Sequence, residues 1–140
     1  MTFEIAETAD LDTCFRLRHA IFVDEQGVPV EEEKDALDHE AIHLLARVDG
    51  APVGTARVVM TGDIAKIGRV CVLPVARGSG LGAALIRAAL DVARAEAKVT
   101  RARLGAQVTA IGFYEKLGFE VVGPVYLDAG IDHRDMEQPV

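Results

Sequence analysis

The stretch Gly68-Arg69-Val70-Cys71-Val72, followed after a short link by Arg77-Gly78-Ser79-Gly80-Leu81-Gly82, reads as a strand that runs into a glycine-rich turn and opens a helix. Glycines at such a place let the backbone turn tightly and approach a ligand closely. The first free N–H groups of the helix then point at that ligand with the positive end of the helix dipole. The pattern predicts a pyrophosphate site, and the alternative is a glycine-rich turn that binds nothing.

Length and composition limit the number of domains and the kinds of partner to be expected. A chain of 140 residues can bury one hydrophobic core without a disulfide or a metal, so we expect a single domain over residues 1–140. A net charge of −7 and the lack of a basic cluster argue against nucleic acid or an anionic membrane as a partner. No apolar run approaches the roughly 20 residues that span a bilayer, and the acidic start is unlike a signal peptide. We therefore expect a cytoplasmic protein with a cationic or neutral substrate.

The two cysteines, Cys14 and Cys71, fall in apolar surroundings. They lack the spacing of metal ligands, so we expect buried, reduced thiols and no metal site. Covalent catalysis through an acyl-Cys71 intermediate is a weaker alternative, because no histidine stands beside this residue in the sequence.

The order of the expected elements indicates the fold class. We expect a strand over 2–6, a helix over 9–22 capped by Thr8, strands over 41–48, 52–60 and 65–73, a helix over 81–97, a strand over 102–108, and a short helix that is capped by Thr109 and ends at Gly118. Three successive strands indicate an antiparallel meander, and the strand–helix–strand unit over 65–108 adds one parallel pair. The predicted class is α/β, with a mixed, mostly antiparallel sheet and flanking helices.

Arg18 stands between Phe15 and Phe22 at helical spacing, on a face that is not expected to be fully solvated. This position predicts a carboxylate partner, and the alternative is an arginine that lays its stem across the two rings with its head in water. The acidic, irregular stretch over 23–40 also contains apolar residues, so it fits a functional loop that folds over a site as well as a solvated connection.

Two motifs resemble the GNAT superfamily of N-acetyltransferases. Arg77, Gly80 and Gly82 match its turn, in which Arg or Gln is followed at fixed spacing by Gly and by Gly or Ala. The stretch from Phe113 to Phe119 is similar to its late signature, an aromatic residue followed by Tyr-x-x-Leu-Gly-Phe. The stretch from Leu17 to Pro29 and the acids after it look like the ElaA- and YjcF-like branch. The resemblance implies a fold in which the fourth and fifth strands splay apart around acetyl-CoA.

The resemblance also implies the donor-binding residues. The pantetheine amides would pair with the backbone of Val70, Cys71 and Val72, and the pyrophosphate would meet the turn made by Arg77, Gly78, Ser79, Gly80, Leu81 and Gly82. Tyr114 matches the tyrosine that in many members protonates the departing CoA thiolate, a role that its high reference pKa suits. The alternative for Tyr114 is ordinary packing beside Phe113.

The reaction that the resemblance implies is direct attack of an amine, on a small molecule or a peptide, on the acetyl thioester. An alkylammonium must first lose its proton, which costs on the order of 4 to 5 kcal/mol at pH 7. Histidine is the best-matched base, and His43 and His133 are the candidates. The expected acceptor-side residues are Arg18, Glu25, Asp35, Asp38 and Arg69, of which Arg69 either contacts the substrate or pairs with the acidic loop.

Two other functions fit the same sequence features. A noncatalytic acyl-CoA-binding sensor would have the same fold and the same glycine turn. The stretch over 18–38 also resembles acyl-homoserine lactone synthases, although those enzymes take acyl chains from acidic carrier proteins, which this acidic chain is poorly suited to dock. The sequence leaves a homodimer open.

Overall fold

The computed structural model describes residues 2–140 and contains one sheet with the strand order β1-β2-β3-β4-β5-β8-β6, in which β7 also pairs with β8. All neighbouring pairs are antiparallel except β4 and β5, which run parallel. The predicted fold class is therefore confirmed. The strands are β1 Glu4–Thr8, β2 Ile42–Val48, β3 Ala51–Thr61, β4 Ile64–Val72, β5 Arg101–Gln107, β6 Glu120–Val121, β7 Tyr126–Asp128 and β8 Ile131–Pro139.

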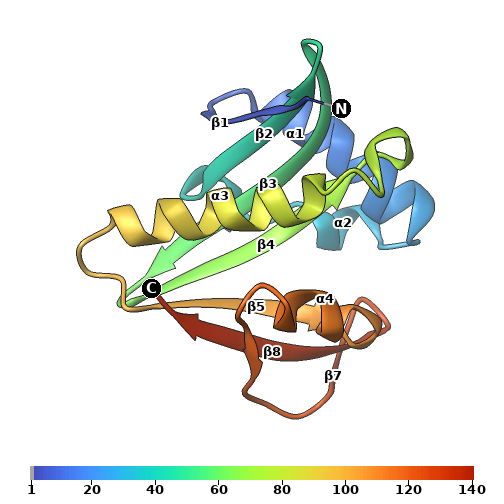
Figure 1. Ribbon diagram of the computed structural model, residues 1–140. Helices are drawn as coiled ribbons and strands as arrows, with labels where there is room; N and C mark the ends of the chain where they lie inside the picture. Colours follow the sequence, from blue (N-terminus) through green and yellow to red (C-terminus); the bar gives the residue numbers. More distant parts are fainter. Residues whose placement is uncertain (1) are drawn as a thin grey trace.

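Helices cover both faces of the sheet (Figure 1). On β2, Leu44 packs in the cluster beneath α3, whereas its neighbour Leu45 packs with Cys14 and Leu17 of α1. Successive residues of a strand point to opposite faces, so α1 and α3 lie on opposite sides. The helices are α1 Leu11–Arg18, π-helix η1 His19–Glu25, α2 Val30–Glu33, α3 Leu81–Ala95 and α4 Ile111–Glu115, with short 3₁₀ turns η2 Ala36–His39, η3 Pro74–Ala76 and η4 Val108–Ala110.

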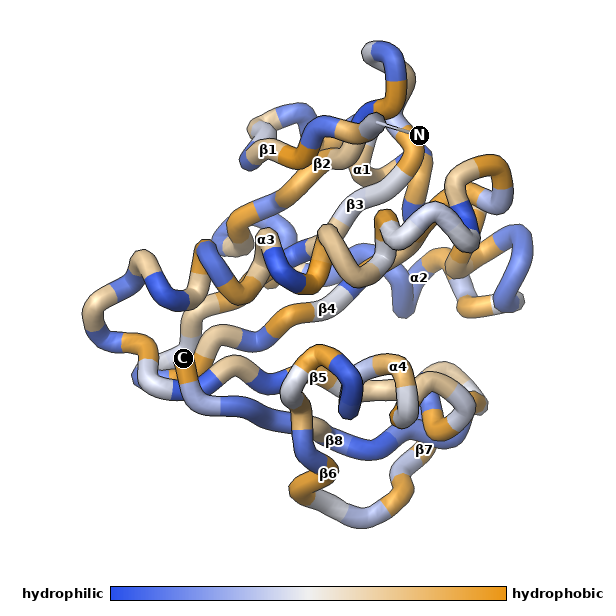
Figure 2. The backbone as a smooth tube through the Cα atoms, viewed as in Figure 1, coloured by the Kyte–Doolittle hydropathy of each residue, from blue (hydrophilic) through white to orange (hydrophobic). Residues whose placement is uncertain are grey.

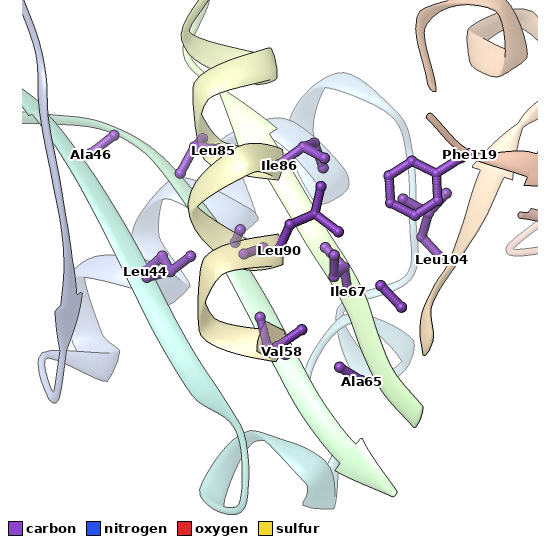
Figure 3. Packing of buried hydrophobic residues seen from close by; sticks show 14 of the residues in the cluster. Leu44, Ala46, Val58, Ala65, Ile67, Leu85, Ile86, Leu90, Leu104 and Phe119 are labelled. Atoms are coloured by element: carbon purple, nitrogen blue, oxygen red, sulfur yellow. The ribbon is translucent and has the colours of Figure 1, made fainter. Parts of the chain in front are cut away.

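The main core forms beneath α3. Figure 3 shows Leu85, Ile86 and Leu90 pointing from this helix toward the strands, and all three are at most 4% exposed. Their spacing puts them on one face of the helix. Phe119 extends the core to the last strands, whereas the tube along β8 is largely hydrophilic (Figure 2). The cluster beneath α3 contains residues of both β4 and β5, among them Ile67 and Leu104.

Strands β4 and β5 are paired over a short stretch and then separate. Their register runs only from Ile64 opposite Arg101 to Ile67 opposite Leu104. Figure 1 shows the two strands close together near the C-terminus and apart near α4. The register of β3 with β4 also shifts between Thr55 and Arg57, which leaves two β4 residues opposite one of β3. Such a bulge bends and twists a strand, and it helps β4 to leave the plane of β5.

Some local predictions need correction. Thr8 does not cap α1; Asp10 does, through a bond from the Thr13 N–H, while the Thr8 hydroxyl accepts from the Asp10 N–H. Thr109 does not cap α4 either, because Ala110 stands at that N-cap without a side-chain bond. The helix expected to end at residue 22 continues as the π-helix to Glu25, and the loop expected to be irregular contains α2 and η2. Gly118 has a φ of 97°, as predicted for a left-handed cap.

Within residues 2–140, none of the helices combines the length and the apolar character that are needed to cross a membrane.

Candidate active site

A cavity of about 380 Å³ occupies the place where β4 and β5 separate. Its walls come from β3 and β4, from η1 and α2, from β5, and from α4 and the β7–β8 hairpin. Arg69, Tyr114 and His133 of the predicted site residues line it, together with Val70. The cavity therefore brings together residues as far apart in the sequence as Phe22 and His133, which are 111 positions apart, in one concave space suited to a small molecule.

The glycine turn at the start of α3 has the conformation that its sequence predicts. Gly78 and Gly80 have φ values of 78° and 86°, which side-chain-bearing residues rarely adopt. Gly80 is the N-cap of α3 and gives it no side-chain hydrogen bond. Nothing lies within 4 Å of a Cβ built on either glycine, so the backbone conformation, and not crowding, demands these glycines. The uncapped N–H groups of a 15-residue helix are available to an anion.

Arg77 and Glu25 form an ion pair beside this turn. Two Arg77 nitrogens, Nη1 and Nη2, donate to the Glu25 carboxylate at 3.0 and 2.6 Å, and Nε donates to the Val72 carbonyl at 3.1 Å. The hydrogen bonds from Arg77 lower the pKa of Glu25. The structure thus places Glu25 at the glycine turn, apart from the other residues predicted on the acceptor side. Ser79 contributes a hydroxyl bond to the Ala76 carbonyl within the turn.

The second half of β4 has a partner on one edge. Cys71 and Val72 pair with Thr55 and Gly54 of β3, whereas pairing with β5 stops at Ile67. The β5-facing edge of β4 beyond the bulge therefore has no strand partner and can take extended ligand groups with amide bonds, although the Val72 carbonyl already accepts from Nε of Arg77. The Cys71 side chain points elsewhere: it is 4% exposed and packs with the α1 cluster. Burial raises the pKa of its thiol to about 12, so the nucleophilic thiolate is scarce and acyl-Cys71 catalysis is disfavoured.

Tyr114 on α4 lines the cavity opposite β4. Its ring makes edge-to-face contacts with Phe113 and Phe119, with centroids 5.0 and 6.1 Å apart. These contacts fix the ring, so packing and a catalytic role are compatible for this residue. Burial raises the pKa of the phenol, which keeps the hydroxyl protonated at neutral pH and able to donate.

The two candidate histidines lie in different environments. His133 on β8 lines the cavity, and its Nδ1 is 2.7 Å from the Ile131 carbonyl oxygen. His43 on β2 is 4% exposed, does not line the cavity, and has Nε2 2.8 Å from the Asp38 carbonyl oxygen. A carbonyl only accepts, so the bonded nitrogen of each neutral ring carries the proton. The free nitrogen of His133 belongs to a cavity-lining side chain, whereas Nδ1 of His43 is buried without a partner among the described residues.

Six charged side chains form one network beneath the cavity, three arginines and three acids: Arg18, Arg57, Arg69, Glu33, Asp35 and Asp38. Arg18, only 1% exposed, donates to the Glu33 carboxylate, to the Glu33 carbonyl at 2.8 Å and to Asp38 at 2.7 Å. Its guanidinium also lies over the Phe15 ring. The predicted carboxylate partner of Arg18 is confirmed, and the alternative with its head in water is wrong.

Arg57 and Arg69 extend the network to the cavity wall. Arg57 donates to Asp35 at 2.7 Å and to Asp38 at 3.0 Å, and Arg69 donates to the Glu33 carbonyl at 3.0 Å. Burial alone would raise the pKa of Asp38, but hydrogen bonds from Arg18, the Asp35 N–H and Arg57 hold it well below its usual range. The acidic loop is therefore tied to the sheet by its own carboxylates.

This geometry separates the residues predicted on the acceptor side. Arg69 lines the cavity and also pairs with the acidic loop, so both of its predicted roles are open to it. Arg18 and Asp38 are buried behind the wall, and Asp35 is taken up by Arg57 and Arg69. The side chains of Arg18, Asp35 and Asp38 bind residues that line the cavity but do not line it themselves.

Sequence reasoning missed Arg57, Gly105 and Tyr126, all of which line the cavity. Arg57 had a signal: it stands within an apolar strand, where a buried charge needs a partner. Gly105 and Tyr126 had none, because their roles arise from the packing of β7 across β8 onto β5.

Comparisons with known proteins agree with this geometry. The family model of the acetyltransferase (GNAT) domain matches residues 13–139. The N-acetyltransferase YjcF of Bacillus subtilis is 39% identical over 127 residues, which covers 90% of each chain. ElaA of Escherichia coli is 32% identical over 136 residues, covering 94% of this chain and 89% of ElaA.

Solved structures give the same result. The crystal structure of Escherichia coli ElaA superimposes with a TM-score of 0.87 at 28% identity, covering 98% of this chain and 99% of ElaA. An acyl-CoA N-acyltransferase from Pseudomonas aeruginosa superimposes with a TM-score of 0.85 at 33% identity, covering 98% of each chain. With its splayed strands, its glycine turn and a family match over nearly its whole length, this chain belongs to the GNAT family of acetyltransferases.

Proposed function

We propose that the protein transfers an acetyl group from acetyl-CoA to the amine of a small molecule or a peptide, within one domain that spans residues 1–140. The observation that carries the proposal is the cavity at the separation of β4 and β5, with the uncapped α3 N-terminus following β4 and Tyr114 in its wall. The turn from Arg77 to Gly82 would hold the pyrophosphate, and the open edge of β4 from Val70 to Val72 would pair with the pantetheine amides.

The reaction would proceed without a covalent enzyme intermediate. The amine nitrogen bonds to the thioester carbonyl carbon, the carbon–sulfur bond breaks, and the CoA thiolate takes a proton from the Tyr114 hydroxyl. The high pKa of the buried Cys71 thiol supports direct attack over acyl transfer through this cysteine.

His133 is the base that the geometry favours. With Nδ1–H donating to the Ile131 carbonyl, Nε2 of the neutral ring is a lone-pair acceptor in a cavity-lining side chain. His43 is the weaker candidate, because its ring lies outside the cavity and its protonated nitrogen is bound to Asp38.

The proposal is tested by CoA release from acetyl-CoA over a panel of polyamines, aminoglycosides, amino acids and peptides. A catalyst releases CoA in an amine-dependent way and forms an equal amount of N-acetylated product. Binding of acetyl-CoA without turnover of any amine in the panel would favour the second reading, a noncatalytic acyl-CoA sensor. The cytoplasmic location stays a prediction from the sequence.

A further inference from the structure

The wall of the cavity that belongs to the β7–β8 hairpin depends on Gly105. A Cβ built on this glycine would lie 2.4 Å from Oη of Tyr126, closer than real carbon atoms approach. Gly105 is opposite Asp135 in the β5–β8 pair, and Tyr126 is opposite His133 in the β7–β8 pair. The Tyr126 side chain therefore crosses β8 and rests its hydroxyl over Gly105, where only glycine leaves room for it.

The side chains of this wall donate their hydrogen bonds to other groups of the protein. The Tyr126 hydroxyl donates its only proton to Oδ1 of Asp135 at 2.7 Å, because an ionised carboxylate only accepts. His133 uses Nδ1–H on the Ile131 carbonyl, and its ring lies nearly parallel to that of Tyr126, with centroids 5.9 Å apart. Both residues line the cavity with their donor protons already used.

What remains for a ligand is a set of hydrogen-bond acceptors. Oη of Tyr126 keeps a lone pair, Nε2 of the neutral His133 ring carries one when Nδ1–H donates to Ile131, and the carboxylate of Asp128, a third cavity-lining residue, only accepts. Burial and the bond to Asp135 raise the pKa of Tyr126, so the phenol keeps the proton that it donates. Such a wall fits a group that is rich in donors and carries positive charge.

We propose that Tyr126 contacts the acceptor and that the Tyr126–His133–Asp128 wall selects a primary aliphatic ammonium, whose three N–H donors meet its three acceptors. Gly105 and Asp135 act as positioning residues, the first by leaving space for the phenol and the second by turning its lone pair toward the ligand. This inference rests on the proposed function and names the chemical class of the acceptor. The ammonium arrives charged, and Nε2 of His133, one of its three contacts, is the atom that takes the proton before attack.

Binding can be measured without turnover, because the chain has two tyrosines and no tryptophan. In a Tyr114→Phe variant the emission of Tyr126 is the only tyrosine signal. We expect n-butylamine to change this emission in a saturable way. N-methylbutylamine, with one N–H donor fewer, should bind several-fold more weakly, and butyrate should have no effect. Equal responses to all three, or none to any, would overturn the inference.

Two substitutions test the wall itself. We expect both Gly105→Ala and Tyr126→Phe to raise the Kd for n-butylamine by about 10-fold or more, as expected for a lost hydrogen bond to a charged group. The Kd of Gly105→Ala is measured by tyrosine emission in the Tyr114→Phe background, and that of Tyr126→Phe by calorimetry. Gly123→Ala is the matched control, because a Cβ there has nothing within 4 Å and φ is not in the left-handed region. Unchanged n-butylamine affinity in both Gly105→Ala and Tyr126→Phe would refute the assignment.

Failure of this inference is distinguishable from failure of the proposed function. Acetyl-CoA should raise the melting temperature of Gly105→Ala and Tyr126→Phe as much as that of the parent protein, because neither residue belongs to the glycine turn or to β4. If acetyl-CoA raises the melting temperature of all three proteins but amines do not change the emission of Tyr126, the assignment of the acetyl-CoA site stands and the ammonium-binding wall is wrong.

Discussion

Replacing Arg18 by methionine should destabilise the protein strongly, although the residue lies outside the cavity wall. Methionine replaces the aliphatic stem of arginine but not its guanidinium, so the change leaves the buried carboxylates of Glu33 and Asp38 without this cation. Removing one partner of a buried ion pair costs about 3–5 kcal/mol. Asp38 retains Arg57 at 3.0 Å, whereas Arg18 is the only ion-pair partner of Glu33 among residues 2–140. We therefore expect the lower end, about 3 kcal/mol, and a melting temperature lower by about 10 °C.

The measurement is urea unfolding followed by far-ultraviolet circular dichroism. Arg94→Met is the matched control, since Arg94 forms an exposed pair with Asp91 at 3.3 Å and should change the free energy of unfolding by less than about 0.5 kcal/mol. The double variant Arg18→Met/Glu33→Met should recover part of the loss, because the unpaired carboxylate of Glu33 is gone. A loss for Arg18→Met no larger than for Arg94→Met would refute the claim that the buried network holds the acidic loop on the sheet.

Three further perturbations test other parts of the account. Gly80→Asp should abolish acetyl-CoA binding in a calorimetric titration, because it puts a negative charge at the α3 N-terminus. Gly62 is the matched control position, since it is also left-handed, with a φ of 62°, but lies on the β3–β4 turn; Gly62→Asp should bind acetyl-CoA normally. Tyr114→Phe should lower kcat by roughly 10- to 1000-fold with acetyl-CoA affinity within a few-fold; an unchanged kcat would leave this residue a packing role. The pKa of Asp38 in the folded protein lies below its ordinary value of 3.8, so its ionised carboxylate should stabilise the fold fully above pH 3.8 and lose this effect as the pH falls further. In unfolding titrations, the loss of stability with acid should be smaller for Arg18→Met than for the parent protein.

Much of the fold could be predicted because its signals are local. Leu11, Cys14, Leu17 and Ile21 recur at helical spacing along α1 and η1, and all of them except Leu11 pack in the cluster with Leu45 and Cys71. Gly118 followed from its position after a short helix. The cap at Thr8 was wrong because the Asp10 carboxylate takes that role at the start of α1. The cap at Thr109 was wrong because α4 begins one residue later, after Ala110, which gives no side-chain bond.

The candidate site was predictable only where one segment carries it. Gly78 and Gly80 define the turn by their own backbone freedom, so the sequence was sufficient there. The acidic loop could not be interpreted in the same way, since identical carboxylates face solvent, substrate or arginine depending on distant chain segments. Arg57 and Arg69 of neighbouring strands donate to Asp35 of this loop. Pairing of Arg69 with the loop was one of its two predicted roles, whereas nothing within residues 23–40 reveals Arg57.

The acceptor wall shows the same limit. Tyr126 and Gly105 are 21 positions apart and meet only because β7 pairs with β8 and β8 pairs with β5. The prediction of His133 as a base came from its residue type and from the resemblance of its segment to the ElaA- and YjcF-like branch. Its tautomer follows from the bond to Ile131 that the structure shows.

The most direct test of the central claim is the melting temperature of the parent protein with saturating acetyl-CoA, with CoA and with neither. We expect acetyl-CoA to raise the melting temperature and CoA to do so nearly as well, because the glycine turn and β4 would bind parts that both molecules share. Ligand at 100 times its Kd stabilises by about 2.7 kcal/mol, which corresponds to roughly 8 to 10 °C for a chain of this size. A folded protein whose melting temperature is the same under all three conditions would contradict the assignment of the cavity to an acyl-CoA donor.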